Sequence, residues 1–268
     1  MRIGLIGFGT IGKAVVKAVD NRLAGDVEIS RILVRDTSKI NVDIEDRIRK
    51  KVTADPVRFF SDDIDVVVEA AGHTALKQYG EYALRTGRDL LAVSVGAFAD
   101  EAFLALIRCA AKESRQKLLV PSGALAGLDA VSSAAVGSID EVALEVRKPP
   151  GAWIGTPAES VALRATDEPI CFYEGKAREA VSAFPQNVNV LAALSLAGIG
   201  FDRTEVKMFV DPGLKHNTFY LSANGEFGEV RLTLKNIPNP ENPKTGRLVV
   251  MSLIKAIARF TQPIIVGF

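Results

Sequence analysis

The first half of the chain alternates short apolar runs with longer segments of helical periodicity. Five apolar runs predict buried β-strands, at residues 2–6, 27–36, 63–73, 88–100 and 117–129. The last three ranges include the small-residue or glycine-rich loop that follows each strand. Between them, helices are predicted at residues 13–25, 74–87 and 100–116. Thr74 is the predicted N-cap of the second helix, and Gly87 lies just past its end. Repeated strand–helix units of this kind predict a parallel sheet that helices cover on both faces.

After about residue 130 the pattern changes to strands of stricter alternation. In residues 228–236 every second residue is apolar (Val230, Leu232, Leu234), which is typical of a half-buried antiparallel strand. Polar turns at residues 211–216 and 224–228 suit hairpin connections. The remaining predicted elements are strands at residues 141–150, 205–210 and 217–223, two helical pieces within 175–200 that break near Pro185, and an apolar helix after a polar loop within 239–260.

Composition and charge favour a soluble globular protein with a small-molecule partner. The 268 residues are 48% apolar and 24% charged, and 33 basic side chains against 32 acidic ones leave a net charge of +1. This balance argues against a nucleic-acid partner, and the apolar runs are too short to span a membrane. Cys109 and Cys171 fit no metal-ligand spacing, so we expect no metal and two buried thiols in a reducing compartment. The N-terminus lacks a cleavage-site pattern, and the expected location is the cytoplasm.

The segment GFGTIG, residues 7–12, follows the first strand and opens the first helix. This is the context that a dinucleotide-binding fingerprint requires. Gly7 permits the tight turn, Gly9 lets a pyrophosphate approach the backbone, and Gly12 lets the helix pack close to the strand. The helix N-terminus then offers unpaired N–H groups to the phosphates. The residues assigned to the cofactor in this segment are Gly7, Gly9, Thr10, Ile11 and Gly12.

Asp36 ends the second predicted strand and is the candidate to bind the adenosine ribose hydroxyls, which favours NAD. Arg35 beside it would instead meet a 2′-phosphate and allow NADP; alternatively, both are solvated turn residues. The expected cofactor is therefore NAD or NADP. Ligands bind at the carboxyl ends of parallel strands, so the loops there are expected to contribute further contacts. These contacts are assigned to Ala71, Gly72, Ser94 and Val95.

Together these patterns predict an α/β protein. A Rossmann dinucleotide-binding domain with a doubly wound parallel sheet is expected over residues 1–122. A second α/β domain with a mixed, largely antiparallel open sheet is expected over residues 123–243, to bind substrate and support oligomerisation. The half-buried sheet of this domain favours a homodimer. Residues 244–268 are expected to form a C-terminal helix that returns to the first domain.

In their order along the chain, the motifs resemble the L-aspartate dehydrogenase family, nearly from end to end. They are GFGTIG, VVEAAGH, SVGAFAD, PSGALAGLDAVSS, KPP, FPQNVNV, DP followed by HN, and NIPNPENPKTG. The resemblance implies a Rossmann domain joined to an α/β domain of the dihydrodipicolinate-reductase type. It also implies NAD(P)-dependent oxidation of L-aspartate to iminoaspartate, which hydrolyses to oxaloacetate and ammonia and can feed NAD synthesis. Ala124, Asn187 and Asn189 would then touch the nicotinamide half of the cofactor.

The strand at residues 217–223 departs from the family pattern. In the family this strand opens Asn-x-His, and the histidine is the proposed catalytic group. Here Asn217 matches the asparagine, which would orient the substrate, and Phe219 stands where the histidine is expected. His216 is the nearest imidazole, but side chains alternate along a strand, so it has the wrong parity unless a bulge or turn re-aims it.

Three interpretations of the missing histidine remain open. His216 acts as the base from the loop, or positioning alone suffices while water, Tyr220 or Lys244 handles protons, or the chain has another substrate or no activity. Lys244 and Thr245 are the candidates to bind substrate carboxylates; alternatively, Thr245 caps the last helix and Lys244 is solvated. Besides an aspartate dehydrogenase, the sequence leaves open a related imine or oxo-acid reductase and a catalytically impaired NAD-binding regulatory protein.

Overall fold

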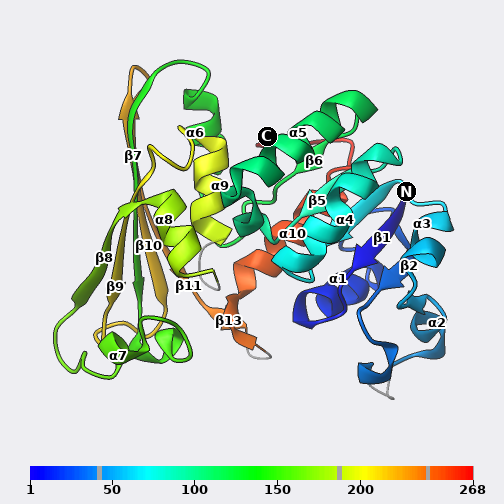
Figure 1. The fold of residues 1–268 in the computed structure, drawn as a ribbon, viewed down its shortest axis with the longest axis horizontal. Helices are drawn as coiled ribbons and strands as arrows, with labels where there is room; N and C mark the ends of the chain where they lie inside the picture. Colours follow the sequence, from blue (N-terminus) through cyan, green and yellow to red (C-terminus); the bar gives the residue numbers. More distant parts are fainter. Residues whose placement is uncertain (41–43, 186–188, 240–241, 268) are drawn as a thin grey trace. The chain divides into compact units, whose positions relative to one another are not determined.

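The apolar runs of the first half form a parallel sheet (Figure 1). The computed structural model describes residues 1–40, 44–185, 189–239 and 242–267, and within these the sheet has six strands. They are β1 (Arg2–Ile6), β2 (Glu28–Leu33), β3 (Val52–Thr53), β4 (Val66–Glu69), β5 (Asp89–Ala92) and β6 (Leu118–Leu119). All neighbours are parallel, and the order β3-β2-β1-β4-β5-β6 reverses beside β1. This is the strand order of a doubly wound Rossmann sheet.

Helices connect these strands near the predicted positions. They include α1 (Thr10–Asp20), α4 (His73–Arg85) and α5 (Glu101–Ser114). The prediction that Thr74 caps α4 is wrong: Gly72 is the N-cap, and its φ of +130° is accessible to glycine, so the helix starts earlier, at His73. The hydrophobic pattern predicts none of the short elements, which are α2 (Asp46–Arg49), β3, α3 (Pro56–Ser61), and the 3₁₀ turns η1 (Thr37–Lys39) and η2 (Val95–Ala99).

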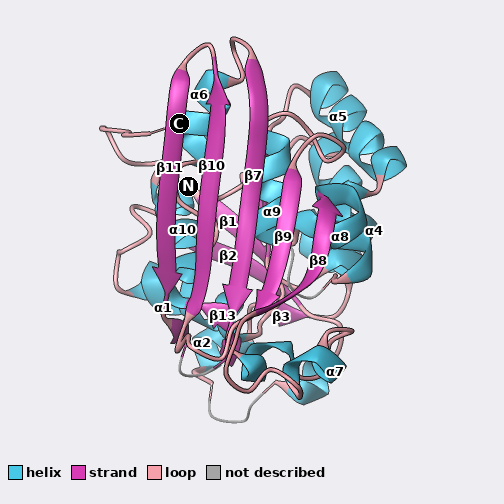
Figure 2. Ribbon diagram, turned by 90° about the vertical axis from the view of Figure 1, so that its left-hand side faces the viewer, coloured by secondary structure: helices cyan, strands magenta, loops and turns pink. Residues whose placement is uncertain are grey.

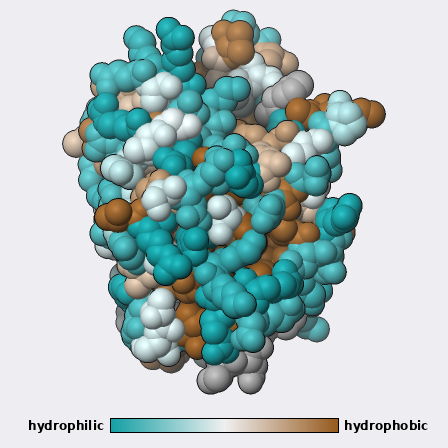
Figure 3. All heavy atoms as spheres, turned by 90° about the vertical axis from the view of Figure 1, so that its right-hand side faces the viewer, coloured by the Kyte–Doolittle hydropathy of each residue, from teal (hydrophilic) through white to brown (hydrophobic). Residues whose placement is uncertain are grey.

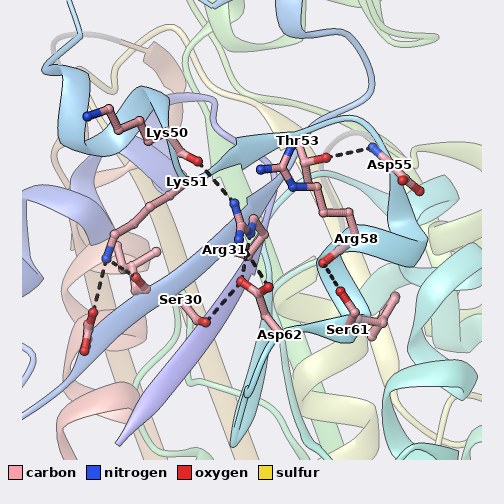
Figure 4. Close-up of polar contacts among 12 residues, drawn as sticks. Ser30, Arg31, Lys50, Lys51, Thr53, Asp55, Arg58, Ser61 and Asp62 are labelled. Carbon is pink, nitrogen blue, oxygen red and sulfur yellow. Dashed lines mark hydrogen bonds and ion pairs between the residues drawn. The ribbon is translucent and has the colours of Figure 1, made fainter.

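Polar contacts hold the short elements against β2 (Figure 4). The Arg31 guanidinium donates to both carboxylate oxygens of Asp62, at 2.8 and 3.2 Å, and to the carbonyl of Lys50 at 3.1 Å. Ser30 donates its hydroxyl to the same carboxylate at 3.4 Å. Lys50 follows α2 and Asp62 follows α3, so a single side chain of β2 ties both connections to the sheet.

The second half forms a mixed sheet, which Figure 2 shows face-on. In the described part of the chain its five strands are β7 (Ile139–Lys148), β8 (Ile170–Lys176), β9 (Glu205–Val210), β10 (Asn217–Gly225) and β11 (Gly228–Asn236). Their order is β11-β10-β7-β9-β8, and β7 with β9 is the parallel pair among antiparallel ones. A hairpin of β12 (Pro238–Asn239) and β13 (Asn242–Gly246) follows. The predicted fold class is confirmed.

One face of this sheet is covered by helices, and the other is open (Figures 1 and 2). The covering helices include α6 (Leu128–Ala134), α8 (Ala177–Ala183) and α9 (Asn189–Ala197), and α7 (Glu159–Ala162) lies in the connection from β7 to β8. Along β10, Phe219 and Leu221 are 4% and 2% exposed on the covered face, whereas Tyr220 between them is 39% exposed. Alternation of this kind is what the sequence of the neighbouring strand β11 predicts.

The chain divides into two compact units. The first comprises Met1–Pro121 and Val250–Val266, and the second comprises Ser122–Val249 together with Gly267. The C-terminal helix α10 (Arg247–Ala258) therefore belongs to the first unit from Val250 onward. The functional roles of the domains expected at residues 1–122, 123–243 and 244–268 remain predictions.

The two cysteines do not occupy the predicted environment. Both are exposed, so the prediction that they are buried is wrong. Cys109 lies on the solvent side of the amphipathic helix α5, where its thiol donates to Glu113 at 3.2 Å, and this contact raises the pKa of the thiol. Cys171 lies on the edge strand β8. Their spacing along the chain carries no information about which side of an element they occupy.

The surface in Figure 3 is mainly hydrophilic, with apolar side chains in smaller groups. Such scattered apolar exposure is ordinary for a folded domain. Within the described ranges, no helix is both long and apolar enough to cross a membrane.

Candidate functional site

The fingerprint loop folds against the ends of two neighbouring strands. The amide of Gly7 donates to the carbonyl of Leu33 in β2 at 2.8 Å. Gly7 has a φ of +102°, and a Cβ added to it would lie 2.8 Å from the carbonyl oxygen of Ala70, which follows β4. A side chain at this position would therefore be strained and would also push the two loops apart.

Gly9 and Gly12 differ in what surrounds them, as the fingerprint predicts. A Cβ on Gly12 would clash with the carbonyl oxygen of Gly7, so glycine is needed for α1 to pack this closely. A Cβ on Gly9 would meet nothing within 4 Å, and Gly9 caps α1 without a side-chain hydrogen bond. Thr10 and Ile11 form the first turn of this helix. Open space beside an uncapped helix N-terminus fits a dinucleotide pyrophosphate.

Asp36 lies beyond the end of β2 and is already engaged locally. Its carboxylate accepts from the amide of Ser38 at 2.9 Å and from the hydroxyl of Ser38 at 2.7 Å, and so caps η1. The Ser38 hydroxyl and amide hold the pKa of Asp36 below its ordinary value. The second carboxylate oxygen lies 4.0 Å from Lys39, and Arg35 is exposed. The arrangement presents an ionised, oriented carboxylate, which can accept hydrogen bonds from ribose hydroxyls.

Glu69 is a structural part of the site that the sequence analysis did not single out. It ends β4 and is fully buried, at 0% exposure. One carboxylate oxygen accepts from the amides of Ala71 and Gly72, at 2.7 and 2.8 Å, and from the hydroxyl of Ser94 at 2.9 Å. The other accepts from the amide of Ser94 at 3.1 Å. One side chain thus brings together the loops that contain Ala71, Gly72, Ser94 and Val95. A carboxylate ending an apolar run before Ala-Ala-Gly was the available signal.

In the second unit, the carboxyl end of β11 fixes the predicted Ala124 loop. Asn236 is 5% exposed, and its side-chain amide donates to the carbonyl of Ala124 at 2.8 Å. Across the β10–β11 pair, Asn236 is the register partner of Asn217. The structure therefore brings the Ala124 loop and Asn217 to the same end of one sheet.

The position of the missing histidine lies apart from His216 and Tyr220, the two candidates for its role whose side chains the structure describes. Phe219 is buried on the covered face, opposite Val146 of β7. His216 is exposed in the turn before β10, and its carbonyl accepts from the hydroxyl of Thr218 at 3.2 Å. Tyr220, the next residue along β10, is 39% exposed and lies on the open face, the side of the sheet opposite to Phe219.

Several predicted residues can be placed only in part. Asn189 is exposed and is the first residue of α9. Asn187 lies outside the described residues. Lys244 and Thr245 belong to β13, but their side chains lie outside the described part of the chain. Their assigned roles stay predictions.

Lys148, the last residue of β7, is a second group that the sequence analysis missed. It is 5% exposed, and its Nζ lies 4.8 Å from the ring centroid of Trp153 in the 3₁₀ turn η3 (Pro150–Trp153). Burial lowers the pKa of Lys148 to about 7. The signal was its parity: it continues the apolar series Val142, Leu144 and Val146 instead of alternating with it.

Comparison with known proteins gives matches over both halves. Residues 129–260 match the family model "Aspartate dehydrogenase, C-terminal", and residues 7–121 match "Homoserine dehydrogenase, NAD binding domain". L-aspartate dehydrogenase from Methanocella arvoryzae is 38% identical over 99% of each chain, and that from Brucella anthropi is 39% identical over 95% of this chain and 94% of the relative. The crystal structure of aspartate dehydrogenase from Thermotoga maritima has a TM-score of 0.77 at 28% identity and covers 100% of this chain and 99% of its own. This chain belongs to the L-aspartate dehydrogenase family.

Proposed function

We propose that the protein is an NAD(P)-dependent amino-acid dehydrogenase that oxidises L-aspartate to iminoaspartate, which water hydrolyses to oxaloacetate and ammonia. The observation that carries the proposal is full-length similarity to L-aspartate dehydrogenases at 38% identity, in a chain whose fingerprint loop fits a dinucleotide. The substrate is a small molecule, a dicarboxylic amino acid. When bound, the cofactor supplies one capability, which is acceptance of a hydride from the substrate's Cα.

The chain's own residues hold the cofactor in this proposal. The segment Gly7–Gly12 faces the pyrophosphate, and Glu69 fixes the backbone of the two neighbouring loops. Asp36 accepts from the adenosine ribose hydroxyls, which favours NAD over NADP. Ala124, Asn187 and Asn189 contact the nicotinamide half, where neutral amides and backbone groups hold a carboxamide without adding charge.

Substrate binding is assigned to the second unit. Lys244 and Thr245 bind the carboxylates, since an ammonium and a hydroxyl are suitable donors for a dicarboxylate. Asn217, half-buried at the start of β10, orients the substrate through its amide. The same face carries Phe219 in place of an imidazole, and this apolar substitution favours, as a second candidate, a related reductase of imines or oxo-acids.

A turnover assay tests the proposal. Purified protein is incubated with NAD+ or NADP+ and a panel of amino acids, and the absorbance of the reduced cofactor is followed. Aspartate turnover supports the proposal, whereas turnover of a different amino acid alone supports the second candidate. Cofactor binding without turnover in either direction, including oxaloacetate with ammonia, would show a regulatory homologue instead.

We further propose that the protein is a homodimer that pairs through the open face of the second sheet. This face has a shallow hollow of about 430 Å³, lined by residues that include Tyr220, Ser222, Glu145 and Lys207. An exposed tyrosine among charges of both signs suits a self-complementary two-fold contact. Light scattering should give twice the 28.7 kDa chain mass, and Tyr220→Glu should lower it toward one chain. A wild-type mass of one chain would contradict the dimer.

The cellular setting is part of the same proposal. Two exposed, unpaired cysteines suit a reducing compartment, and we assign the protein to the cytoplasm. Iminoaspartate released there can supply NAD synthesis. Trapping of this imine during aspartate turnover, before hydrolysis to oxaloacetate, would support that supply; release of oxaloacetate alone would contradict it.

A further inference from the structure

One end of the second sheet gathers polar side chains, and Asn217, Asn236 and Lys148 share the parity of its covered face. Asn236 of β11 pairs in register with Asn217 of β10, and Thr218 pairs with Arg147 of β7. The register ends at this pair, and continuing it by one residue would place Asn217, the first residue of β10, opposite Lys148, the last residue of β7. Side chains directly opposite in an antiparallel pair have Cβ atoms about 5 Å apart. Lys148 therefore lies beside the residue proposed to orient the substrate.

Lys148 also lies next to the position where the histidine is absent. Phe219 pairs with Val146, and Lys148 is two residues beyond Val146 on the same face. Diagonal neighbours of this kind are about 7–8 Å apart, within reach of a long side chain. The lysine side chain has a four-carbon stem, so the Lys148 amine can reach the surroundings of position 219. A histidine at that position would face the same surroundings.

The surroundings hold Lys148 in place and keep it from water. Trp153, whose ring it faces at 4.8 Å, is itself 0% exposed and donates its indole N–H to the carbonyl of Phe209 at 3.2 Å. The carbonyl of Lys148 accepts from the amide of Asp211 at 2.9 Å, which fixes the end of β7. The charged side chains beside it along β7 and after β9 are Arg147 and Asp211, and these pair with each other at 3.3 Å.

A lysine in such a place suits proton transfer. Burying an ammonium is costly, so burial lowers the pKa of Lys148 to about 7 and favours the neutral amine. A neutral amine near physiological pH is a competent general base. The phenyl ring of Phe219 cannot accept a proton, and His216 is exposed and outside the strand.

We propose that Lys148 is the catalytic base that takes the proton from the substrate's ammonium group, beside Asn217 and in place of the histidine missing at Phe219. This inference rests on the proposed function. The Lys148 amine takes one proton from the aspartate ammonium and becomes an ammonium itself. The resulting substrate amine has a free lone pair, which would stabilise Cα if a bound NAD(P)+ accepted the hydride from it, and loss of that hydride would leave the protonated imine. Water then adds to the imine carbon and ammonium departs, leaving oxaloacetate, while Lys148 returns its proton to solvent.

The test combines a wild-type pH profile with two variants. In the wild type, kcat/KM for aspartate should rise with pH through a midpoint near 7. Lys148→Met should lower kcat/KM about 100-fold or more at pH 7 and lose that limb, and added primary alkylamines should restore part of the rate. Binding of reduced cofactor, followed by fluorescence, should be unchanged. Lys235→Met, at an exposed lysine on the neighbouring strand β11, is the matched control and should keep both rate and profile.

The outcomes separate this inference from the proposed function. No aspartate turnover by the wild type would remove the proposed function, and the inference with it. Aspartate turnover by a wild type that lacks the limb near pH 7 would overturn the Lys148 assignment alone, whether or not the variants fold. The same holds if His216→Ala abolishes the limb while Lys148→Met retains it.

Discussion

Replacing Glu69 by glutamine probes the tie between the two cofactor loops. The substitution keeps the size and shape of the side chain but exchanges one carboxylate oxygen for an NH2 group. In the wild type all four hydrogen bonds to Glu69 come from donors: the amides of Ala71, Gly72 and Ser94 and the hydroxyl of Ser94. Glutamine can keep three of them at its remaining oxygen, but its NH2 group then faces the amide of Ser94, where two donors oppose each other.

The structure sets the size of the effect. Ser94 is 6% exposed, so its amide would lose its acceptor with little compensation from water. A buried donor left unsatisfied costs about 1–3 kcal/mol, and loss of a bond to a carboxylate costs a similar amount. We therefore expect Glu69→Gln to lower the free energy of unfolding by about 2–4 kcal/mol. For a protein of this size, at roughly 2 °C per kcal/mol, that corresponds to a fall in melting temperature of about 4–8 °C.

The assay measures stability and cofactor binding together. Thermal unfolding is followed with and without NAD, and the Kd for NAD is measured at the same pH. Because the loops of Gly72 and Ser94 lose their common anchor, the Kd should rise on the order of tenfold, a difference of about 1.4 kcal/mol. Glu28→Gln is the control: this exposed carboxylate lies 3.3 Å from Lys51, and its loss should cost less than about 0.5 kcal/mol. A Glu69→Gln variant as stable as the control, with the Kd for NAD unchanged, would refute the anchoring argument.

Three further predictions follow from burial, space and charge. Lys148 has a pKa lowered from 10.5 to about 7 in the fold, so the unfolded chain binds its proton more tightly between these values; wild-type stability should rise with pH across that window. Below pH 7 the buried charge of Lys148 costs on the order of 5 kcal/mol, so Lys148→Met should have a higher melting temperature than the wild type at pH 6 and should lack the rise of stability with pH. Curves of melting temperature against pH that run parallel for the two proteins would contradict this prediction. Gly12→Ala should lower the melting temperature because its Cβ meets the Gly7 carbonyl, whereas Gly9→Ala should leave stability unchanged and raise the Kd for NAD; equal melting curves for the two would count against the packing argument. Asp36→Ser should raise the kcat/KM ratio of NADP to NAD about tenfold or more, since it removes the carboxylate that would repel a 2′-phosphate, and an unchanged ratio would place the ribose elsewhere.

Elements with a strong local pattern were predictable from the sequence. The fingerprint segment 7–12 has its three glycines at a fixed spacing: a side chain at Gly7 or Gly12 would meet nearby backbone, whereas the space beside Gly9 is open. Strand β11 alternates because one face packs on helices and the other is open. The short elements α2, β3 and α3 are only four, two and six residues long, too short to show a periodic pattern, although α2 buries Ile48 and α3 buries Phe59 and Phe60. The role of Glu69 was not predicted, because its partner Ser94 is 25 residues away along the chain. The two residues become neighbours only through the parallel pairing of β4 with β5.

The chemistry at the end of the second sheet shows most directly what pairing adds to a sequence. The alternation of side chains along β10 was enough to show that Phe219 and His216 do not share a face of the sheet. Side chains alternate within one strand whatever lies beside it. Parity along β7 marked Lys148 as a covered-face residue but could not relate it to Asn217, which is about 70 residues away and comes near it only through the register of β7 with β10. Shifting that register by one residue would turn Lys148 to the open face, where an ammonium is solvated and its pKa is ordinary. The register of β7 with β10 thus brings the buried amine of Lys148 near Phe219, where the histidine is absent. Lys148 can therefore supply the base that the histidine would have supplied.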